Sequence, residues 1–190
     1  MSVFDMNSIP PKDFLAKTRT VFLYGGIDTA MAFEVGFKLK LLDYLDSKEP
    51  ITLEINSPGG EIAAGLAIID TMNFVKSPVR TVVCGMAASM AAVIAASGEK
   101  GMRLATENSK IMIHQPLASL GYSQASDVAI FSENILKTKQ QLNRILAIAC
   151  KKTVAEIEKD TDRDYHMTAQ EAIAYGIIDN IVNNQKGDVK

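Results

Sequence analysis

Short apolar runs that alternate with helix-length segments constrain the fold of this chain more than any other feature. The runs are rich in β-branched residues, and two of them end at Gly-Gly and at Asn-Ser-Pro-Gly-Gly, which are turn signals. We expect strands at 20–24, 51–55, 79–84 and 110–113, and helices at 31–45, 62–74 and 87–96. Strands that alternate with helices predict an α/β fold of parallel βαβ units, with helices covering the sheet.

The pattern changes near residue 126, where one amphipathic helix is expected over residues 126–150. Leu142 belongs to its apolar stripe, whereas Lys137 and Asn143 belong to its polar face. The helix is longer than most helices of globular domains. Periodicity alone leaves open whether the stripe packs on its own domain or on a partner chain.

Shorter elements complete the predicted chain. Two helices are expected at 154–160 and 169–175, followed by a strand at 177–182. The first twelve residues contain a Pro-Pro pair without a clear period, and we predict an extended arm there. The polar residues 183–190 are expected to fray.

Composition favours one globular domain and argues against several functions. Of the 190 residues, 47% are hydrophobic and 22% are charged, which is ordinary for a single domain. A net charge of −2 gives no electrostatic support for nucleic-acid binding. Cys84 and Cys150 lack zinc-ligand spacing, so we expect thiols in a reducing compartment. Without a recognisable signal peptide, membrane span or nucleotide loop, the expected location is the cytoplasm.

A serine and a histidine, each next to a predicted strand, are the main candidates for chemistry. Ser89 lies in Gly-Met-Ala-Ala-Ser-Met, in the first turn of a predicted helix, where free N–H groups favour negative charge. His114 follows the strand at 110–113, and strand ends carry site residues in α/β proteins. A serine needs such a base to act as a nucleophile. On local grounds, a helix cap at Ser89 and a structural role for His114 stay open.

Three other features could complete such a site. The segment 160–164 holds three aspartates, any of which could orient an imidazole, although a solvated turn is the alternative. The Gly59-Gly60 pair could offer amide donors to an oxyanion, or could form an ordinary turn. His166 is the competing histidine.

Seven segments of the chain together resemble the ClpP family, the proteolytic subunits of the Clp proteases. They are FLYGGID (22–28), INSPGG (55–60), AGLAIIDTM (64–72), CGMAASM (84–90), IMIHQP (111–116), EKDTDRD (158–164) and EAIAYGIID (171–179). The resemblance covers about 20–182 and implies the ClpP/crotonase fold, an α/β fold of stacked ββα units with a protruding handle helix. It implies a single peptidase domain, 1–190, with an N-terminal arm (1–19), a handle region (117–150) and a frayed tail (184–190).

The same resemblance implies a serine endopeptidase that hydrolyses peptide bonds of unfolded polypeptides. Ser89 would be the nucleophile, His114 the general base and Asp164 the acid that orients the imidazole. The amides of Gly60 and Met90 would form the oxyanion hole. No metal or other cofactor is implied for the chain itself.

The family further implies heptameric rings that stack into a tetradecamer and receive substrate from an AAA+ unfoldase of the Clp family, which alone uses ATP. Asp162 and Arg163 match a pair at the contact between rings. The chain departs from the family in its N-terminal segment, at the handle entry 118–123, and at His166, where Phe is common. These departures suggest a divergent second paralogue that needs a partner isoform.

Two alternatives to an active peptidase follow from the sequence. One is a structural or regulatory subunit of a mixed ring, with little activity alone. The other is a crotonase-type acyl-CoA enzyme, which shares the fold but has no use for a Ser-His-Asp set, and which ranks far below the peptidase.

Overall fold

The structure, a computed structural model, describes residues 11–182. Its helices are α1 (Pro11–Thr18), α2 (Thr29–Leu45), α3 (Ile62–Phe74), α4 (Met90–Ala96), α5 (Ala125–Cys150), α6 (Val154–Asp160) and α7 (Ala169–Tyr175). Its strands are β1 (Thr20–Tyr24), β2 (Ile51–Ser57), β3 (Val79–Ala88), β4 (Arg103–Ala105), β5 (Lys110–Ile113), β6 (Tyr165–Thr168) and β7 (Asn180–Ile181).

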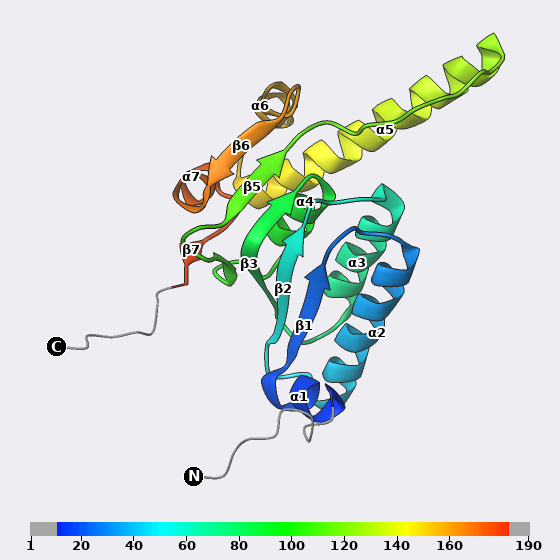
Figure 1. The fold of residues 1–190 in the computed structure, drawn as a ribbon. Helices are drawn as coiled ribbons and strands as arrows, with labels where there is room; N and C mark the ends of the chain where they lie inside the picture. The colour runs from blue at the N-terminus through cyan, green and yellow to red at the C-terminus, as the bar shows by residue number, and fades with distance from the viewer. Residues whose placement is uncertain (1–10, 183–190) are drawn as a thin grey trace, which may run out of the picture.

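The strands form one mixed sheet. β1, β2, β3, β4 and β7 lie side by side in that order and pair in parallel. β5 pairs in parallel with β3, and β6 closes the other edge as an antiparallel partner of β5. Figure 1 shows α2 and α3 stacked together on one side of β1 and β2. The predicted α/β class is confirmed, with one antiparallel pair added.

Alternation of buried side chains explains why the first strands and α2 pack as they do. Val21 and Leu23 of β1 are fully buried, as expected for one face of a strand. In α2, Val35, Leu39 and Leu42 are buried at helical spacing. The Asp28 side chain accepts a 2.7 Å hydrogen bond from the Met31 amide, and this cap starts the helix two residues before the predicted boundary.

The third strand changes its neighbour along its length. Thr81, Val82 and Val83 pair with β4, whereas Met86, Ala87 and Ala88 pair with β5. Between the two stretches, Gly85 has a φ of 103°, a conformation that favours glycine. β3 therefore runs four residues beyond its predicted end and joins two parts of the sheet.

Helix α4 is the centre of the core. All seven of its residues are buried, as the Ala-rich composition predicts, because small side chains let strands and helices approach from several sides. The predicted start at Ala87 is wrong, since Ala87 and Ala88 extend β3 and the helix begins at Met90. Ser89 consequently lies before the first turn rather than in it.

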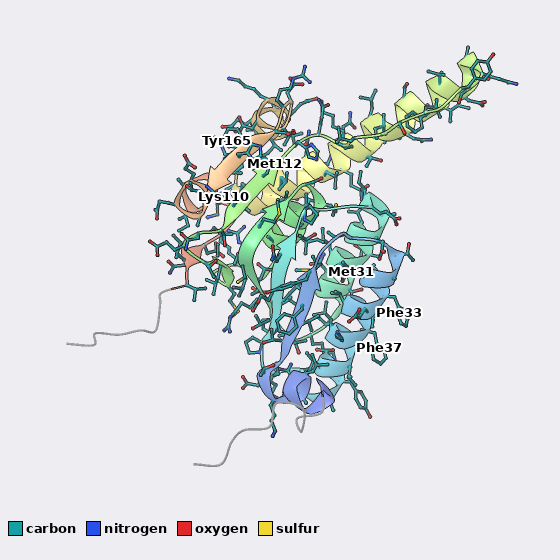
Figure 2. The ribbon with its side chains drawn as sticks, viewed as in Figure 1. Met31, Phe33, Phe37, Lys110, Met112 and Tyr165 are labelled. Carbon is teal, nitrogen blue, oxygen red and sulfur yellow. The ribbon has the colours of Figure 1, made fainter. Side chains whose placement is uncertain are left out.

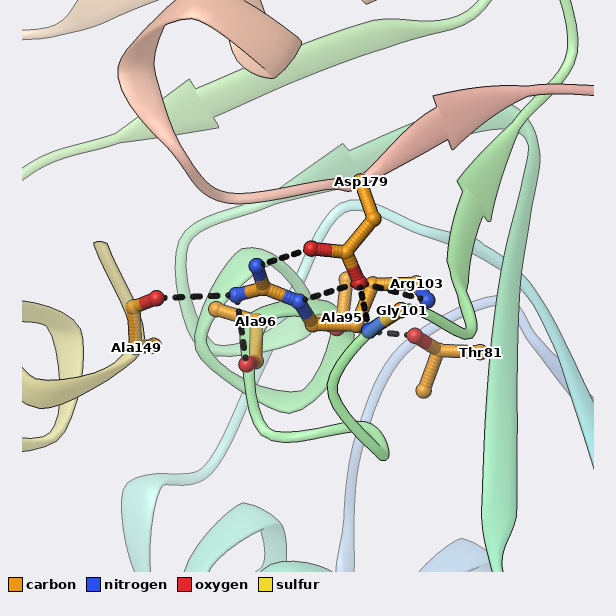
Figure 3. A network of polar contacts seen from close by, with 7 residues as sticks. All are labelled: Thr81, Ala95, Ala96, Gly101, Arg103, Ala149 and Asp179. Carbon is orange, nitrogen blue, oxygen red and sulfur yellow. Dashed lines mark hydrogen bonds and ion pairs between the residues drawn. The ribbon is translucent and has the colours of Figure 1, made fainter. Parts of the chain in front are cut away.

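An ion pair with a buried guanidinium joins the C-terminal end of α4 to the last elements of the chain (Figure 3). Arg103 is buried, and its guanidinium bonds both carboxylate oxygens of Asp179, at 2.9 and 2.5 Å. It also donates to the carbonyls of Ala96 and Ala149. Burial alone would raise the pKa of Asp179, but the hydrogen bonds and charge of Arg103, with the Gly101 amide, lower it.

Only the C-terminal part of helix α5 packs on the domain. Its buried residues, including Leu142, Asn143 and Leu146, all lie in the C-terminal part. The N-terminal part projects from the body as the predicted handle (Figure 1) and exposes Val128 and Ile130. The prediction that Asn143 belongs to the polar face of this helix is wrong. Its side chain is buried and lies 3.4 Å from the hydroxyl of Thr161.

Most predicted elements are confirmed, with boundaries that differ by at most four residues, and further points need correction. Residues 11–18 form α1, so the predicted extended arm is wrong at its end, while residues 1–10 and the tail 183–190 lie outside the described part. β4 and β6 were not predicted, and the last strand is only Asn180–Ile181. None of the described helices has the length and apolar character needed to cross a membrane.

Candidate active site

Ser89 is held at the junction between β3 and α4. Its backbone has φ 56° and ψ −125°, a region that a residue with a side chain rarely adopts. Ser89 occupies the N-cap position of α4, but its side chain makes no cap hydrogen bond. Instead Oγ lies 2.8 Å from Nε2 of His114. The hydroxyl is therefore directed to the imidazole, and the alternative of a simple helix cap does not hold.

His114 reaches Ser89 because β5 pairs with the final stretch of β3. The Ser89 amide donates to the carbonyl of Met112 at 2.9 Å, which fixes the end of β3 against β5. The His114 side chain is only 12% exposed. Its second ring nitrogen, Nδ1, lies 3.3 Å from Oδ1 of Asp164. The imidazole thus contacts a hydroxyl on one side and a carboxylate on the other.

Asp164 comes from the loop between α6 and β6, and Gln115 fastens that loop to β5. The Gln115 amide donates to the carbonyl of Thr161 at 2.7 Å, and its side-chain Nε2 donates to the carbonyl of Asp162 at 2.9 Å. Thr161 is fully buried and donates to the carbonyl of Ile157. The Asp164 side chain itself is 61% exposed.

The other candidates of the acidic segment lie elsewhere. Asp160 accepts a 2.9 Å hydrogen bond from the hydroxyl of Tyr175 and lies near Lys152. Asp162 and Arg163 are both exposed and 3.9 Å apart. His166 is exposed on β6, so the structure brings His114, not His166, to Ser89.

The Gly59-Gly60 turn lies against Ser89. A β-carbon on Gly59 would come within 2.8 Å of the Ser89 β-carbon, and one on Gly60 within 2.1 Å of the Ile27 carbonyl oxygen. Both glycines have positive φ. The Gly59 amide donates to the hydroxyl of Ser57. The Glu61 amide donates to the carbonyl of Ile27. Only glycines fit this close approach.

Met90 supplies a second amide near Ser89. It is the first residue of α4, and the first N–H groups of a helix have no acceptor within the helix. The would-be β-carbon of Gly59 lies 3.1 Å from the Met90 amide nitrogen. The glycine turn and this amide therefore adjoin one another beside Ser89.

A cavity of about 270 Å³ opens beside these groups. It is lined by Ser89, His114, Gly60 and Met90, together with apolar residues of α4 and α5 that include Val93, Leu142 and Leu146. The C-terminal part of α5 thus forms one wall. The cavity can hold an apolar side chain next to the hydroxyl of Ser89.

Sequence reasoning missed the supporting residues Gln115, Asn143 and Thr161. Gln115 directly follows His114, and its position after a strand was a usable signal. The burial of Asn143 depends on how α5 crosses the domain, which periodicity alone does not specify. Cys150 is buried and Cys84 is partly buried, both as free thiols, and burial raises the pKa of Cys150 to about 11.

The described residues contain no group of three or more His, Cys, Asp or Glu side chains arranged to hold a metal ion. In the site, a serine hydroxyl contacts an imidazole, and the imidazole contacts a carboxylate. On a mixed α/β sheet, with two glycines and a helix start beside the hydroxyl, this is the arrangement of a serine hydrolase.

Comparison with known proteins narrows this class. Residues 5–185 match the Clp protease family. Proteins named "ATP-dependent Clp protease proteolytic subunit" from Streptococcus pyogenes (strain Manfredo) and Streptococcus equi subsp. equi are 48% identical over 173 residues, which cover 90% of this chain and 88% of theirs. The chain belongs to the Clp protease family. The resemblance inferred from the seven segments is confirmed, as is the class, a proteolytic core subunit and serine endopeptidase.

Proposed function

We propose that this chain hydrolyses peptide bonds of unfolded polypeptides with Ser89 as nucleophile, His114 as general base and Asp164 as the group that orients the imidazole. The observation that carries the proposal is the 2.8 Å contact between Ser89 Oγ and His114 Nε2, with Asp164 on the other ring nitrogen. A nucleophile and base at hydrogen-bond distance, with the base oriented by a third group, form the working set of a serine hydrolase.

The reaction proceeds through an acyl-enzyme. Ser89 Oγ gives its proton to His114 Nε2 and attacks the peptide carbonyl carbon. His114 then gives that proton to the leaving amine nitrogen as the C–N bond breaks. A water molecule loses a proton to His114 and attacks the ester carbon, and the proton returns to Ser89 Oγ as the acid product leaves. Asp164 stabilises the positive charge on the imidazole in both halves.

The amides of Gly60 and Met90 bind the oxyanion that forms on the carbonyl oxygen. Their position beside Ser89, and the steric need for glycine in the turn, support this role. An amide donor that is already in place stabilises the transition state without reorganisation. The apolar wall formed by Val93, Leu142 and Leu146 supports a preference for an apolar substrate side chain.

The proposal extends to assembly, as a single peptidase domain in stacked heptameric rings, a tetradecamer. Exposed apolar side chains support contacts with further copies: Phe33 and Phe37 on α2, labelled in Figure 2, and Ile130 on the handle. Asp162 and Arg163 are exposed, as a contact between rings requires. A second isoform is a further candidate for such contacts.

The name of the relatives, an ATP-dependent protease, supports an AAA+ unfoldase of the Clp family as the partner that uses ATP. The chain then needs no cofactor of its own. We place the assembly in the cytoplasm, because reduced Cys84 and Cys150 fit a reducing compartment.

A fluorophosphonate probe tests the catalytic set directly. Intact mass measurement of the full chain should show one adduct, and Ser89→Ala should show none while keeping its far-ultraviolet circular dichroism and its thermal unfolding midpoint. Peptide hydrolysis by Ser89→Ala should fall by about 10⁴-fold or more.

Two results would count against this function. An adduct that persists in Ser89→Ala would place the reactive nucleophile elsewhere. No adduct on the wild-type chain, whether alone or mixed with a second isoform, would favour the structural or regulatory subunit of a mixed ring.

A further inference from the structure

The antiparallel pairing of β5 with β6 brings the second histidine of the chain beside the first. Ile113 lies opposite Tyr165, and Met112 lies opposite His166. One step further along the same register, His114 lies opposite Asp164, in agreement with their 3.3 Å contact. Because side chains alternate between the two faces of a strand, Met112, His114, Asp164 and His166 share one face.

Burial along β5, and at Met167 of β6, agrees with this assignment, whereas Tyr165 at the start of β6 is 42% exposed. Ile111, Ile113 and Met167 are buried in the core, so the other face of β5 and β6 is turned outward. His166 is exposed there, and Met112 lines the cavity that also contains Ser89 and His114. Figure 2 shows Met112 and Tyr165 on these neighbouring strands, close to the start of the handle. The face that carries His166 therefore continues into the candidate active site.

Strand geometry sets the distances on this face. Residues two apart on a strand are separated by about 6.6 Å, so His166 lies within side-chain reach of Asp164. Diagonal neighbours on paired strands are about 7–8 Å apart, which is the relation of His166 to His114. Asp164 is 61% exposed and meets His114 only at 3.3 Å. Its carboxylate is therefore open to solvent as well as to His114.

We propose that His166 is a positioning residue that acts through Asp164. While His166 is neutral, the Asp164 carboxylate interacts with His114 alone. When His166 takes a proton from solvent, its charge attracts Asp164 and disfavours a second positive charge on His114. An imidazole ordinarily changes charge between pH 5 and 8, so the strength of the base at Ser89 depends on the state of His166. This inference rests on the proposed roles of His114 and Asp164.

Other charged groups adjoin this face. From β5, Lys110 lies opposite Thr168 and adds a positive charge to the face. From α7, Glu171 adds a negative charge near Thr168; hydrogen bonds from Thr168 and, less strongly, the charge of Lys110 lower the pKa of Glu171. Asp164 is the carboxylate two residues from His166 on the same face.

The experiment is a pH titration of the ring resonances by nuclear magnetic resonance on the full-length, assembled protein. The chain contains only two histidines, so His166→Phe assigns both signals. In His166→Phe, the midpoint of His114 should rise, corresponding to about a threefold gain in proton affinity, as removal of a charge at this separation predicts. His166→Lys, which fixes the charge, should lower the midpoint by a similar factor.

Gln170→Lys, which adds the same charge at an exposed position on α7, is the matched control and should leave His114 unchanged. In peptide hydrolysis, kcat on the alkaline plateau should be about threefold lower for His166→Lys than for His166→Phe, with KM unchanged. Identical His114 midpoints in the wild type, His166→Phe and His166→Lys would overturn the proposal. The titration needs no turnover, so this failure is distinct from a failure of Ser89 to react with the fluorophosphonate probe.

Discussion

The two sides of the candidate active site are built very differently. On the side of the proposed nucleophile, Ser89 follows a strand in the middle of the sheet and precedes α4, every residue of which is buried. On the side of the proposed acid, Asp164 lies on a loop at the sheet edge, with its side chain mostly exposed. His114 stands between the two, 2.8 Å from one and 3.3 Å from the other.

This difference predicts which changes affect the folding stability of the protein and which affect its activity alone. The position of Ser89 cannot change without disturbing the packing of α4, the glycine turn and β3, because a close-packed core transmits small displacements. The position of Asp164 depends on a few hydrogen bonds of the loop, chiefly those from Gln115. Damage to the first side should therefore reduce folding stability or abolish activity, whereas damage to the second should reduce activity and leave the fold intact.

The largest effect is expected at the ion pair that joins the C-terminal end of α4 to the last elements of the chain. Arg103→Met leaves the largely covered Asp179 carboxylate, 20% exposed, without its guanidinium partner and should lower the free energy of unfolding by about 3 kcal/mol. Urea unfolding at a fixed protein concentration measures it, since subunit association also contributes to apparent stability. Arg103→Met combined with Asp179→Leu should recover much of the loss; a double variant as unstable as the single one would contradict this account.

The same pair gives the unfolding free energy a pH dependence. The pKa of Asp179 is lowered in the folded protein, so its contribution is complete above the ordinary carboxyl range and is lost as the pH falls below about 4. The wild type should lose stability faster than the double variant over this acidic range.

The next largest effect concerns the glycine turn against Ser89. Gly59→Ala places a β-carbon 2.7 Å from the Ala88 carbonyl oxygen and 2.8 Å from the Ser89 β-carbon, and it should lower kcat by about 100-fold through displacement of the nucleophile.

Gly25→Ala is the matched control for the turn variant. Gly25 also has a positive φ, but a β-carbon there meets nothing within 4 Å. This variant should cost about 1–2 kcal/mol of stability from backbone strain and leave kcat nearly unchanged. Equal losses of kcat in the two variants would mean that backbone strain alone, and not the contact with Ser89, decides the effect.

The smallest of these effects is expected on the acid side. Gln115→Ala removes the hydrogen bond to the Asp162 carbonyl and should lower kcat about tenfold. The unfolding free energy should change by only about 1 kcal/mol. Gln140→Ala, at an exposed position of α5, should change neither quantity. Unaltered kcat in Gln115→Ala would show that the backbone bond from Gln115 to Thr161 holds the loop alone.

The sequence by itself determined the alternation of strands and helices, because each element has its own hydrophobic periodicity and is ended by its own turn-forming residues. The boundaries of α3, α6 and α7 agree with the structure to the residue. Helical spacing, caps and glycine turns are local properties, and local properties are what a sequence displays. The family and its class of activity also followed from the sequence, through seven matching segments.

Tertiary structure decided the features that depend on distant partners. β4 and β6 are short strands that exist through pairing with β3 and β5, and neither has a pattern long enough to detect. Asn143 is buried because α5 meets the loop that holds Thr161. The contact of His114 with Asp164, and not with Asp160 or Asp162, follows from the register of β6 on β5, since residues far apart in the chain become neighbours only when the strands pair.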